Sequence, residues 1–424
     1  MKPLRKVAVI GGVRIPFVKS FREYSRISNQ EMLTKSVQAT VSRFKLNGQL
    51  IGDVALGAIL TFPSDWNLAR EVVLGTDLDH RTPGFNLQRA CGTSLEAVNL
   101  LALKIATGQI DSAIAGGSDT NSDLPVTGPR SLGWKLIELQ NAKSFGDRVG
   151  KFLKLRPSDL KPVIPGIREP RTGKTMGEHT EIMVKEWKIS RQAQDELAYL
   201  SHMNAAKAYN EGFYDDMLTE FKGVKRDTIV RPDTTVEKLS KLRTAFDKSP
   251  AGSLTAGNST IFTDGAASIL LASEEFASKN NLNVQAYFVD GEAAAVDHVH
   301  GAGLLMAPTL AVARMLKRNN LTLQDFDFYE IHEAFAGQVL CTLKAWEDDE
   351  YCRKQLGTEK ALGSIDRSKL NVKGGSVAIG HPFGATGTRV TMNLAKLLAQ
   401  KGKGRGLLSV WTAGGMGVTA ILER

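Results

Sequence analysis

The chain has 424 residues, of which 42% are hydrophobic and 23% charged, and this is enough for two or three domains around a substantial core. No stretch approaches the roughly twenty apolar residues of a membrane span, and the first apolar run, residues 7–10, is too short for the core of a signal peptide. The composition therefore argues against secretion and membrane insertion. The net charge of +9 fits nucleic acid, a membrane surface or a polyanionic small substrate, and charge alone does not choose between them.

Only three cysteines are present, Cys91, Cys341 and Cys352, and no two of them have the spacing of a metal site or a redox motif. A reducing compartment is the simplest setting for such a chain. We therefore expect a cytoplasmic protein.

The first sixty residues alternate between strand and helix patterns. Residues 6–10 form a short β-branched run that ends at Gly11 and Gly12, which predicts a first buried strand. A dinucleotide-binding loop is set aside because the third glycine of its motif is absent. Residues 30–44 have helical spacing of apolar positions, and residues 53–60 return to a strand-like pattern. The order strand, helix, strand indicates an α/β layered domain.

Cys91 directly precedes a strongly amphipathic helix predicted over residues 95–106. Thr93 and Ser94 suit the first turn or the cap of that helix. Unpaired backbone N–H groups and the helix dipole at such a position favour the thiolate, so Cys91 is a candidate nucleophile. The alternative is a small buried apolar residue, which is the commoner role of a lone cysteine.

Residues 121–249 differ in composition from their flanks, and we interpret them as an insertion between strands of the first α/β half. Within them, residues 130–174 hold eleven Lys or Arg residues against four Asp or Glu, interleaved with Trp134, Phe145 and Phe152. This pattern fits a solvated basic face, a site for the phosphates of coenzyme A or for a partner, or a basic amphipathic helix that rests on anionic lipid. Residues 190–211 show an ordinary helix pattern.

His332 and Glu333 stand at the end of a short apolar run, just before an alanine-rich helix start. The pair would suggest zinc only if a second histidine stood at position 336, where the chain has alanine, so metal binding is disfavoured. The better functional interpretation of His332 is that it orients a water or donates to an oxyanion. A hydrogen-bonded structural histidine remains the alternative.

His381 lies in a glycine-bordered loop that we predict to connect a strand over residues 376–379 with a helix over residues 388–400. The glycines leave the backbone bare on both sides of the imidazole, and the helix start adds a partial positive charge. Such a loop suits an anionic intermediate. In the alternative interpretation the glycines only form a turn and the histidine caps the helix.

The order of elements around Cys91 recurs around His381. The helix after Cys91 is followed by a strand over residues 112–115 and a Gly-Gly pair, and the helix after His381 by a strand over residues 407–411 and another Gly-Gly pair. The two halves look like copies of one supersecondary plan. If they pack as pseudo-symmetric mates, Cys91 and His381 converge on one central site.

One thiol and two histidines on such loops suit nucleophilic acyl transfer. His381 would accept the proton of Cys91, and the thiolate would attack a thioester carbonyl. His332 and backbone N–H groups would stabilise the developing negative charge. A thioester suits a thiol nucleophile because the exchange is nearly isoenergetic.

Six stretches of the chain resemble, in order, the characteristic blocks of the thiolase family: GGVRIPF, RACGTS, GNSTIFTDGAA, HEAFAGQ, NVKGGSVAIGHPFGATGTR and AGGMG. The resemblance spans nearly the whole chain. The HEAF block, together with NLAREVVLG, is closest to the β-subunit of the fatty-acid-oxidation trifunctional complex. The resemblance implies a duplicated α/β/α core, with one half formed by residues 1–120 plus 250–275, the other by residues 276–424, and an inserted loop domain over residues 121–249.

The resemblance also implies an activity. A thiolase of this type cleaves 3-ketoacyl-CoA with CoA to acetyl-CoA and a shortened acyl-CoA in fatty-acid β-oxidation, with CoA and acyl-CoA as substrates and with no cofactor or metal. It further implies a homodimer or homotetramer that does not bind nucleic acid. A hydratase/dehydrogenase α-subunit and a peripheral membrane contact through the basic segment are further expected partners.

The resemblance assigns the family's catalytic roles to four residues of this chain. Cys91 would be the acylated nucleophile and His381 its base. His332 would hold the water of the oxyanion hole that binds the enolate. The backbone N–H groups of Cys91 and Ala413 would form a second hole, for the acyl-enzyme.

Trp411 is a departure from the family, which has a second reactive cysteine at this position to move the proton on the α-carbon of acetyl-CoA. Indole is a hydrogen-bond donor without usable acidity near neutral pH, so it cannot replace that thiol. A thioester hydrolase, a ketosynthase-like condensing enzyme and a non-catalytic acyl-CoA-binding subunit therefore remain alternatives to a working thiolase.

Overall fold

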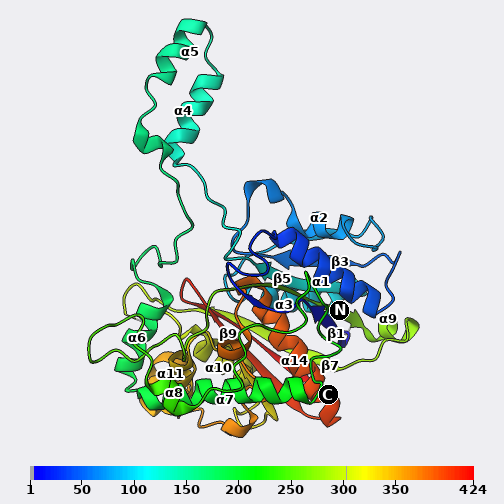
Figure 1. Cartoon of the computed structure of the whole chain (residues 1–424). Helices are drawn as coiled ribbons and strands as arrows, with labels where there is room; N and C mark the ends of the chain where they lie inside the picture. Colours follow the sequence, from blue (N-terminus) through cyan, green and yellow to red (C-terminus); the bar gives the residue numbers. More distant parts are fainter. Residues whose placement is uncertain (1–3, 302) are drawn as a thin grey trace.

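A ten-stranded mixed sheet runs through the chain and carries helices on its faces (Figure 1). The structure is a computed structural model and describes residues 4–301 and 303–424. Across the sheet the strands follow in the order β4 (Gly84–Asn86), β3 (Asp53–Gly57), β5 (Ser112–Asp119), β6 (Thr263–Ser273), β1 (Val7–Arg14), β7 (Ala286–Ala295), β10 (Met416–Glu423), β9 (Arg405–Thr412) and β8 (Phe328–Ile331), and the short β2 (Val18–Lys19) pairs with β6.

The helices connect these strands and fill the insertion. They are α1 (Asn29–Arg43), α2 (Leu68–Leu74), α3 (Thr93–Ala106), α4 (Arg130–Gln140), α5 (Phe145–Phe152), α6 (Met176–Glu186), α7 (Arg191–Asn210), α8 (Val236–Ser240), α9 (Glu274–Lys279), α10 (Ala307–Asn319), α11 (Ala336–Glu347), α12 (Asp349–Tyr351), α13 (Ser376–Ile379) and α14 (Thr386–Lys401). In the described ranges, no helix combines the length and the apolarity needed to cross a membrane. The helices predicted over residues 30–44, 95–106 and 388–400 correspond to α1, α3 and α14.

The strand pairing repeats in the two halves of the chain. In the first half β3 runs parallel to β5, β5 is antiparallel to β6, and β6 is antiparallel to β1. In the second half β8 runs parallel to β9, β9 is antiparallel to β10, and β10 is antiparallel to β7. Pairing of β1 with β7 joins the two halves into one sheet. This repeat confirms the predicted α/β class with a duplicated core.

Alternating side chains of the central strands build a core on each face of the sheet. Val7 and Val9 of β1 belong to the apolar cluster that contains α3 and α14, whereas Ala8 and Ile10 belong to the cluster that contains α1. Successive residues of a strand point to opposite faces, so the continuous apolar run is buried on both sides. Helices α3 and α14 therefore share the inner layer, and α1 covers the opposite face.

The starts of α3 and α14 pack closely against each other. A Cβ atom on Gly387 would lie only 2.2 Å from the backbone nitrogen of Leu95, so only glycine fits there. The backbone N–H of Thr388 donates to the Ser94 hydroxyl at 2.8 Å. The loops that precede the two helices are thereby brought together, and they carry Cys91 and His381.

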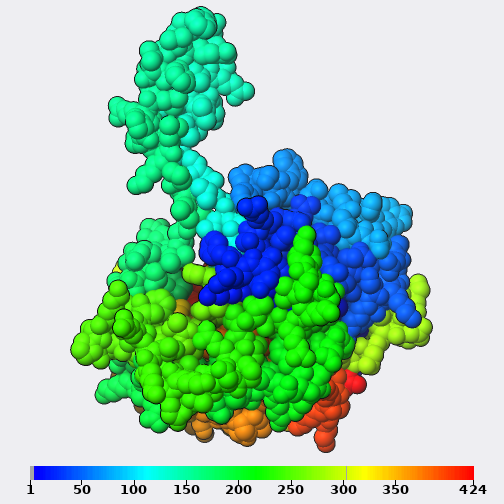
Figure 2. Space-filling view, in the orientation of Figure 1, coloured from blue at the N-terminus to red at the C-terminus, as the bar shows by residue number. Residues whose placement is uncertain are grey.

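The chain between β5 and β6 forms the predicted insertion, which contains α4 to α8. The helix predicted over residues 190–211 is α7, and the Ser190 hydroxyl caps it by accepting from the N–H of Ala193 at 3.1 Å. The α4–α5 hairpin projects from the body of the molecule (Figures 1 and 2). The division into residues 1–120 plus 250–275, 121–249 and 276–424 stays a prediction, which the repeated strand pairing supports.

Three strand predictions are wrong in type or in extent. The strand predicted over residues 53–60 is β3, which ends at Gly57. The run 376–379 is the short helix α13, because Val377 packs against Ala198 and Leu239 of the insertion and the run has no strand neighbour. Strand β1 does not end at Gly11 but continues to Arg14. Gly12 lies so close to β6 that a Cβ atom would be 2.0 Å from the Ser268 carbonyl oxygen, so the glycine permits strand pairing and does not end it.

We expect Gly387→Ala to lower the stability of the protein by at least about 1–3 kcal/mol, because the added methyl group meets backbone and not a movable side chain. Thermal unfolding followed by circular dichroism measures the effect. Gly133→Ala is the matched control, since Gly133 lies in α4 and a Cβ atom there meets open space. A Gly387→Ala protein that melts at the wild-type temperature contradicts this account of the helix contact.

Candidate active site

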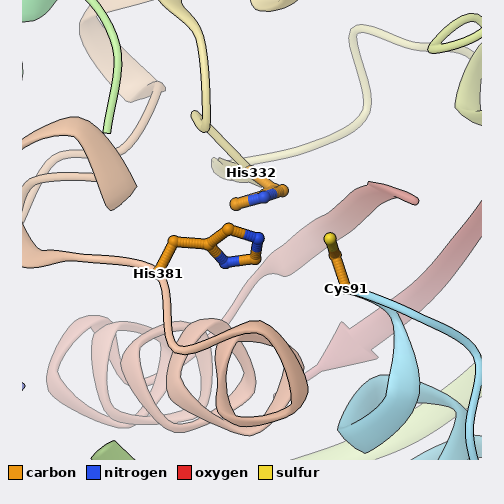
Figure 3. Close-up of side chains that lie close together, drawn as sticks. All are labelled: Cys91, His332 and His381. Atoms are coloured by element: carbon orange, nitrogen blue, oxygen red, sulfur yellow. The ribbon is translucent and has the colours of Figure 1, made fainter. Parts of the chain in front are cut away.

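Cys91, His332 and His381 meet at one buried place in the structure (Figure 3). Cys91 lies just before α3, His332 follows β8, and His381 lies between α13 and α14. The Cys91 sulfur and one ring nitrogen of each histidine all lie within 4.8 Å of one another. The expected convergence of the two halves is therefore observed, and the histidine after β8 joins it.

Two hydrogen bonds fix the position of His381, one at its backbone N–H and one at a ring nitrogen. Gly380 has a φ of +113°, which favours glycine, and this turn ends α13 and redirects the chain. The backbone N–H of His381 donates to the Thr263 hydroxyl at 2.8 Å, and Nδ1 lies 2.6 Å from the Thr386 hydroxyl. Within the described residues Nε2 has no hydrogen-bond partner, so it is the nitrogen available to the Cys91 sulfur.

The His332 ring is oriented by a buried hydroxyl and a buried guanidinium. Nδ1 lies 2.9 Å from Ser376 Oγ, and Arg389 Nη2 donates to the same oxygen at 2.9 Å. Because Arg389 occupies a lone pair of that oxygen, the Ser376 hydroxyl proton is free to donate to Nδ1. If the Ser376 hydroxyl donates to Nδ1, the proton of the neutral ring resides on Nε2, which has no hydrogen-bond partner among the described residues. In that tautomer His332 is a hydrogen-bond donor toward the site.

The protonation state of Cys91 corrects the sequence-based expectation of a thiolate. Burial raises the pKa of the Cys91 thiol to about 12, although hydrogen bonds from the backbone N–H groups of Ala413 and Cys91 act in the opposite direction. Burial, followed by the Arg389 charge, lowers the pKa of His381 to about 3, and burial lowers that of His332 well below its usual value. The resting site therefore contains a neutral thiol and two neutral imidazoles.

Trp411 and Ala413 border the same site from the end of β9. The backbone N–H of Ala413 points at the Cys91 sulfur. The Trp411 side chain is 2% exposed, its ring centroid lies 5.3 Å from that of His332, and it stacks on Phe335 at 6.0 Å. In the part of the chain that the structure describes, the indole Nε1 has no hydrogen-bond partner. Trp411 thus places a large apolar ring, and no acid, beside His332.

The sequence-based reasoning missed the residues that position the site. Ser376, Arg389 and Thr386 all lie in the block around His381, so the signal that could have found them is a set of hydroxyl and guanidinium groups next to a candidate base. Asp119 is another positioning residue that the sequence-based reasoning missed. Its carboxylate accepts from the backbone N–H of Gly384 at 2.7 Å and so connects the His381 loop to β5.

The same three donor atoms, one thiol and two imidazoles, match the ligand types of a zinc site. Ligating histidines usually donate their other N–H to a carboxylate, a backbone carbonyl or water. Here each second nitrogen faces a hydroxyl, of Ser376 or Thr386. Our expectation that the site holds no metal stays a prediction.

We expect the alkylation rate of Cys91 by iodoacetamide to rise about tenfold per pH unit between about pH 7 and 9.5, because a pKa near 12 keeps the thiolate fraction small throughout this range. Peptide mass spectrometry resolves Cys91 from the other cysteines. A short, solvent-exposed cysteine peptide is the control, because its rate levels off above the ordinary thiol pKa of about 8.5. A Cys91 rate that does not depend on pH would show that the helix end outweighs burial.

Comparisons with known proteins show to which family the chain belongs. The family model of the thiolase N-terminal domain matches residues 7–275, and that of the thiolase C-terminal domain matches residues 282–424. A 3-ketoacyl-CoA thiolase of Yersinia pestis (strain Pestoides F) is 37% identical over 424 residues, which cover 99% of this chain and 97% of that protein.

Solved structures show the same fold over full lengths. The acetyl-CoA acetyltransferase of Bacillus anthracis is 29% identical with a TM-score of 0.81, and human mitochondrial 3-ketoacyl-CoA thiolase is 25% identical with a TM-score of 0.82. In both comparisons 100% of each chain is covered. On this sequence and structural evidence, the chain belongs to the thiolase family of acyltransferases.

Proposed function

We propose that this protein is a 3-ketoacyl-CoA thiolase, which uses CoA to cleave a 3-ketoacyl-CoA into acetyl-CoA and a shortened acyl-CoA in fatty-acid β-oxidation. The observation that carries the proposal is the meeting of the Cys91 sulfur with the free nitrogens of His332 and His381. The relatives that bear the name 3-ketoacyl-CoA thiolase support this substrate class. CoA and acyl-CoA are the substrates, and no cofactor is needed.

In the first half-reaction, His381 Nε2 accepts the proton of Cys91 while the sulfur attacks the 3-keto carbonyl carbon. The bond between C2 and C3 then breaks, which leaves the acyl group on Cys91 and an acetyl-CoA enolate. His332 Nε2–H, through a water, stabilises the enolate oxygen. Because both partners are neutral at rest, the proton moves as the sulfur attacks and not before.

In the second half-reaction, CoA gives its thiol proton to His381 and attacks the acyl group on Cys91. The backbone N–H groups of Cys91 and Ala413 hold the oxygen of the tetrahedral intermediate. The Cys91 sulfur then leaves with the proton from His381, and the shortened acyl-CoA is released. Both N–H groups point at the Cys91 sulfur, where this intermediate forms.

Trp411 affects the fate of the enolate, whose α-carbon needs a proton before acetyl-CoA can leave. The indole cannot supply that proton near neutral pH. Protonation must then come from the His381 imidazolium or from water, which is slower than from a placed thiol. A thiolase-like protein impaired in carbon–carbon chemistry is therefore the second candidate, in the form of a thioester hydrolase, a ketosynthase-like condensing enzyme or a non-catalytic acyl-CoA-binding subunit.

The resemblance to thiolases extends the proposal to location and assembly. The protein acts in the cytoplasm as a homodimer or homotetramer, with a hydratase/dehydrogenase α-subunit as a partner that supplies its 3-ketoacyl-CoA, and it does not bind nucleic acid. A peripheral membrane contact belongs to the same set of expectations.

The proposal is tested with a medium- or long-chain 3-ketoacyl-CoA, with and without free CoA. We expect an acyl adduct on Cys91 in intact-mass spectra without CoA, and acetyl-CoA release in repeated turnovers only with CoA. Cys91→Ala should abolish both signals, and Cys341→Ala, which removes a buried thiol outside the three-residue site, should keep them. Absence of adduct and of cleavage sinks the proposal. An adduct without CoA-dependent turnover selects a thioester hydrolase or a condensing enzyme, whereas the absence of both signals selects the non-catalytic acyl-CoA-binding subunit.

We expect Trp411→Cys to raise the rate of carbon–carbon cleavage by roughly a hundred- to ten-thousand-fold, because it restores a general acid beside His332, while acylation of Cys91 from a simple acyl-CoA changes little. Steady-state acetyl-CoA release and single-turnover acylation give the two rates. Trp411→Ser is the matched control, since it removes the same bulk without adding an acid. Equal gains in both variants would assign the effect of Trp411 to crowding, and an unchanged rate in Trp411→Cys would refute our account of it.

A further inference from the structure

Glu330 is a carboxylate in the apolar layer behind the site. In β8 it lies beside Leu408 of β9, and Leu408 belongs to the apolar cluster that contains α3 and α14. Neighbouring residues of paired strands point to the same face of a sheet, so the Glu330 side chain points toward this layer. It is 1% exposed, and within the described residues neither carboxylate oxygen has a hydrogen-bond partner. Such a buried carboxylate needs an opposite charge nearby.

Arg389, near the start of α14, supplies that charge. Burial lowers the pKa of the Arg389 guanidinium, and the Glu330 charge is the largest influence in the opposite direction. Burial likewise raises the pKa of Glu330 to about 8, and the Arg389 charge is the largest influence that lowers it. Because the start of a helix is itself positive, it disfavours a further cation there. Each of the two buried charges therefore depends on the other.

Arg389 connects this charge pair to His332. Arg389 Nη2 donates to Ser376 Oγ at 2.9 Å, whereas Nε and Nη1 have no hydrogen-bond partner in the part of the chain that the structure describes. His332 Nδ1 lies 2.9 Å from the same oxygen. While Arg389 donates to this oxygen, the hydroxyl proton is directed to Nδ1. Without that bond the oxygen accepts a proton from Nδ1 instead, which is the opposite tautomer of the ring.

We propose that Glu330 is a positioning residue, which acts through Arg389 on the Ser376 hydroxyl. The result is a His332 ring that carries its proton on Nε2. In the proposed mechanism this N–H stabilises the enolate oxygen through a water, whereas the opposite tautomer would turn a lone pair toward the developing negative charge. A buried ion pair is often no more stabilising than apolar side chains of similar volume, so a role in the reaction accounts for this one better than stability does.

The tautomer is measured directly, in protein labelled with ¹⁵N in its histidine side chains. A His332→Asn variant assigns the two ring nitrogens of His332 by the loss of their NMR signals. We expect the proton on Nε2 in the wild type, and a shift of population toward Nδ1–H in Glu330→Gln and in Ser376→Ala. Asp53→Asn is the matched control, because Asp53 of β3 is also a buried strand carboxylate and pairs with Lys104 at the end of α3. It should leave the His332 signals unchanged.

Rates separate this role from general damage to the fold, and this part of the test rests on the proposed function. Glu330→Gln should lower kcat for 3-ketoacyl-CoA cleavage by roughly ten- to a hundredfold with KM within about twofold, because the enolate is absent from the bound substrate. Acylation of Cys91 from a simple acyl-CoA forms no enolate and should stay within about twofold of the wild type. Asp53→Asn should change neither rate.

A double variant tests whether Glu330 acts through Ser376. Glu330→Gln with Ser376→Ala should cost about as much in kcat as Ser376→Ala alone, because both changes affect the same proton. Glu330→Leu with Arg389→Met removes the charge pair without leaving one charge unpaired, so it tests the tautomer even if Glu330→Gln does not fold. It should show the same shift toward Nδ1–H.

Three results overturn the proposal. One is a wild-type His332 with its proton on Nδ1, and another is a wild-type tautomer in the variants that lack Glu330. The third is a full additional loss of kcat in the double variant with Ser376→Ala, which would show that Glu330 acts by another route. A wild-type protein that neither acylates Cys91 nor cleaves 3-ketoacyl-CoA refutes the proposed function instead, and the tautomer measurement on the resting protein still decides the role of Glu330.

Discussion

The contact between the starts of α3 and α14 is the constraint on which the rest of the site depends. Glycine at position 387 lets the two backbones approach, and the hydrogen bond from Thr388 to Ser94 sets their relative position. Each helix is preceded by a loop with one reactive side chain, so this single contact places the Cys91 thiol against the His381 imidazole. Because a contact between two helices is more rigid than one between two loops, it keeps the distance between the Cys91 thiol and the His381 imidazole constant.

Burial decides the chemistry of that pair. The helix start beside Cys91 favours a thiolate, but removal of the sulfur from water outweighs it, and the same removal keeps both imidazoles neutral. Burial therefore disfavours a resting ion pair between Cys91 and His381. Negative charge develops only when a substrate carbonyl is present, at a point where N–H groups already aim. In the proposed mechanism these N–H groups stabilise the negative charge of the intermediate.

Local patterns predicted the α/β class, the helices α1, α3, α7 and α14, and the three side chains that meet, because helical periodicity and motif residues are properties of neighbours in sequence. The helix start predicts a lowered pKa for the Cys91 thiol. The structure indicates a raised one, because segments distant in the sequence bury the sulfur. The strand predicted over residues 376–379 was wrong because a run of four apolar residues does not show whether a neighbouring strand is available to pair with it. The roles of Ser376 and Arg389 were out of reach for a similar reason, since their partner His332 lies more than forty residues away in the chain.

The repeated strand pairing has a consequence for how this site arose. Cys91 and His381 occupy equivalent positions in the two halves, each on the loop before the inner helix. A symmetric dimer of identical half-length chains would place two cysteines or two histidines there, and neither arrangement joins a nucleophile to a base. A pair of unlike side chains at this place, such as the nucleophile and base that we propose, therefore needs two halves of different sequence, and their linkage in one polypeptide keeps the two unlike halves paired.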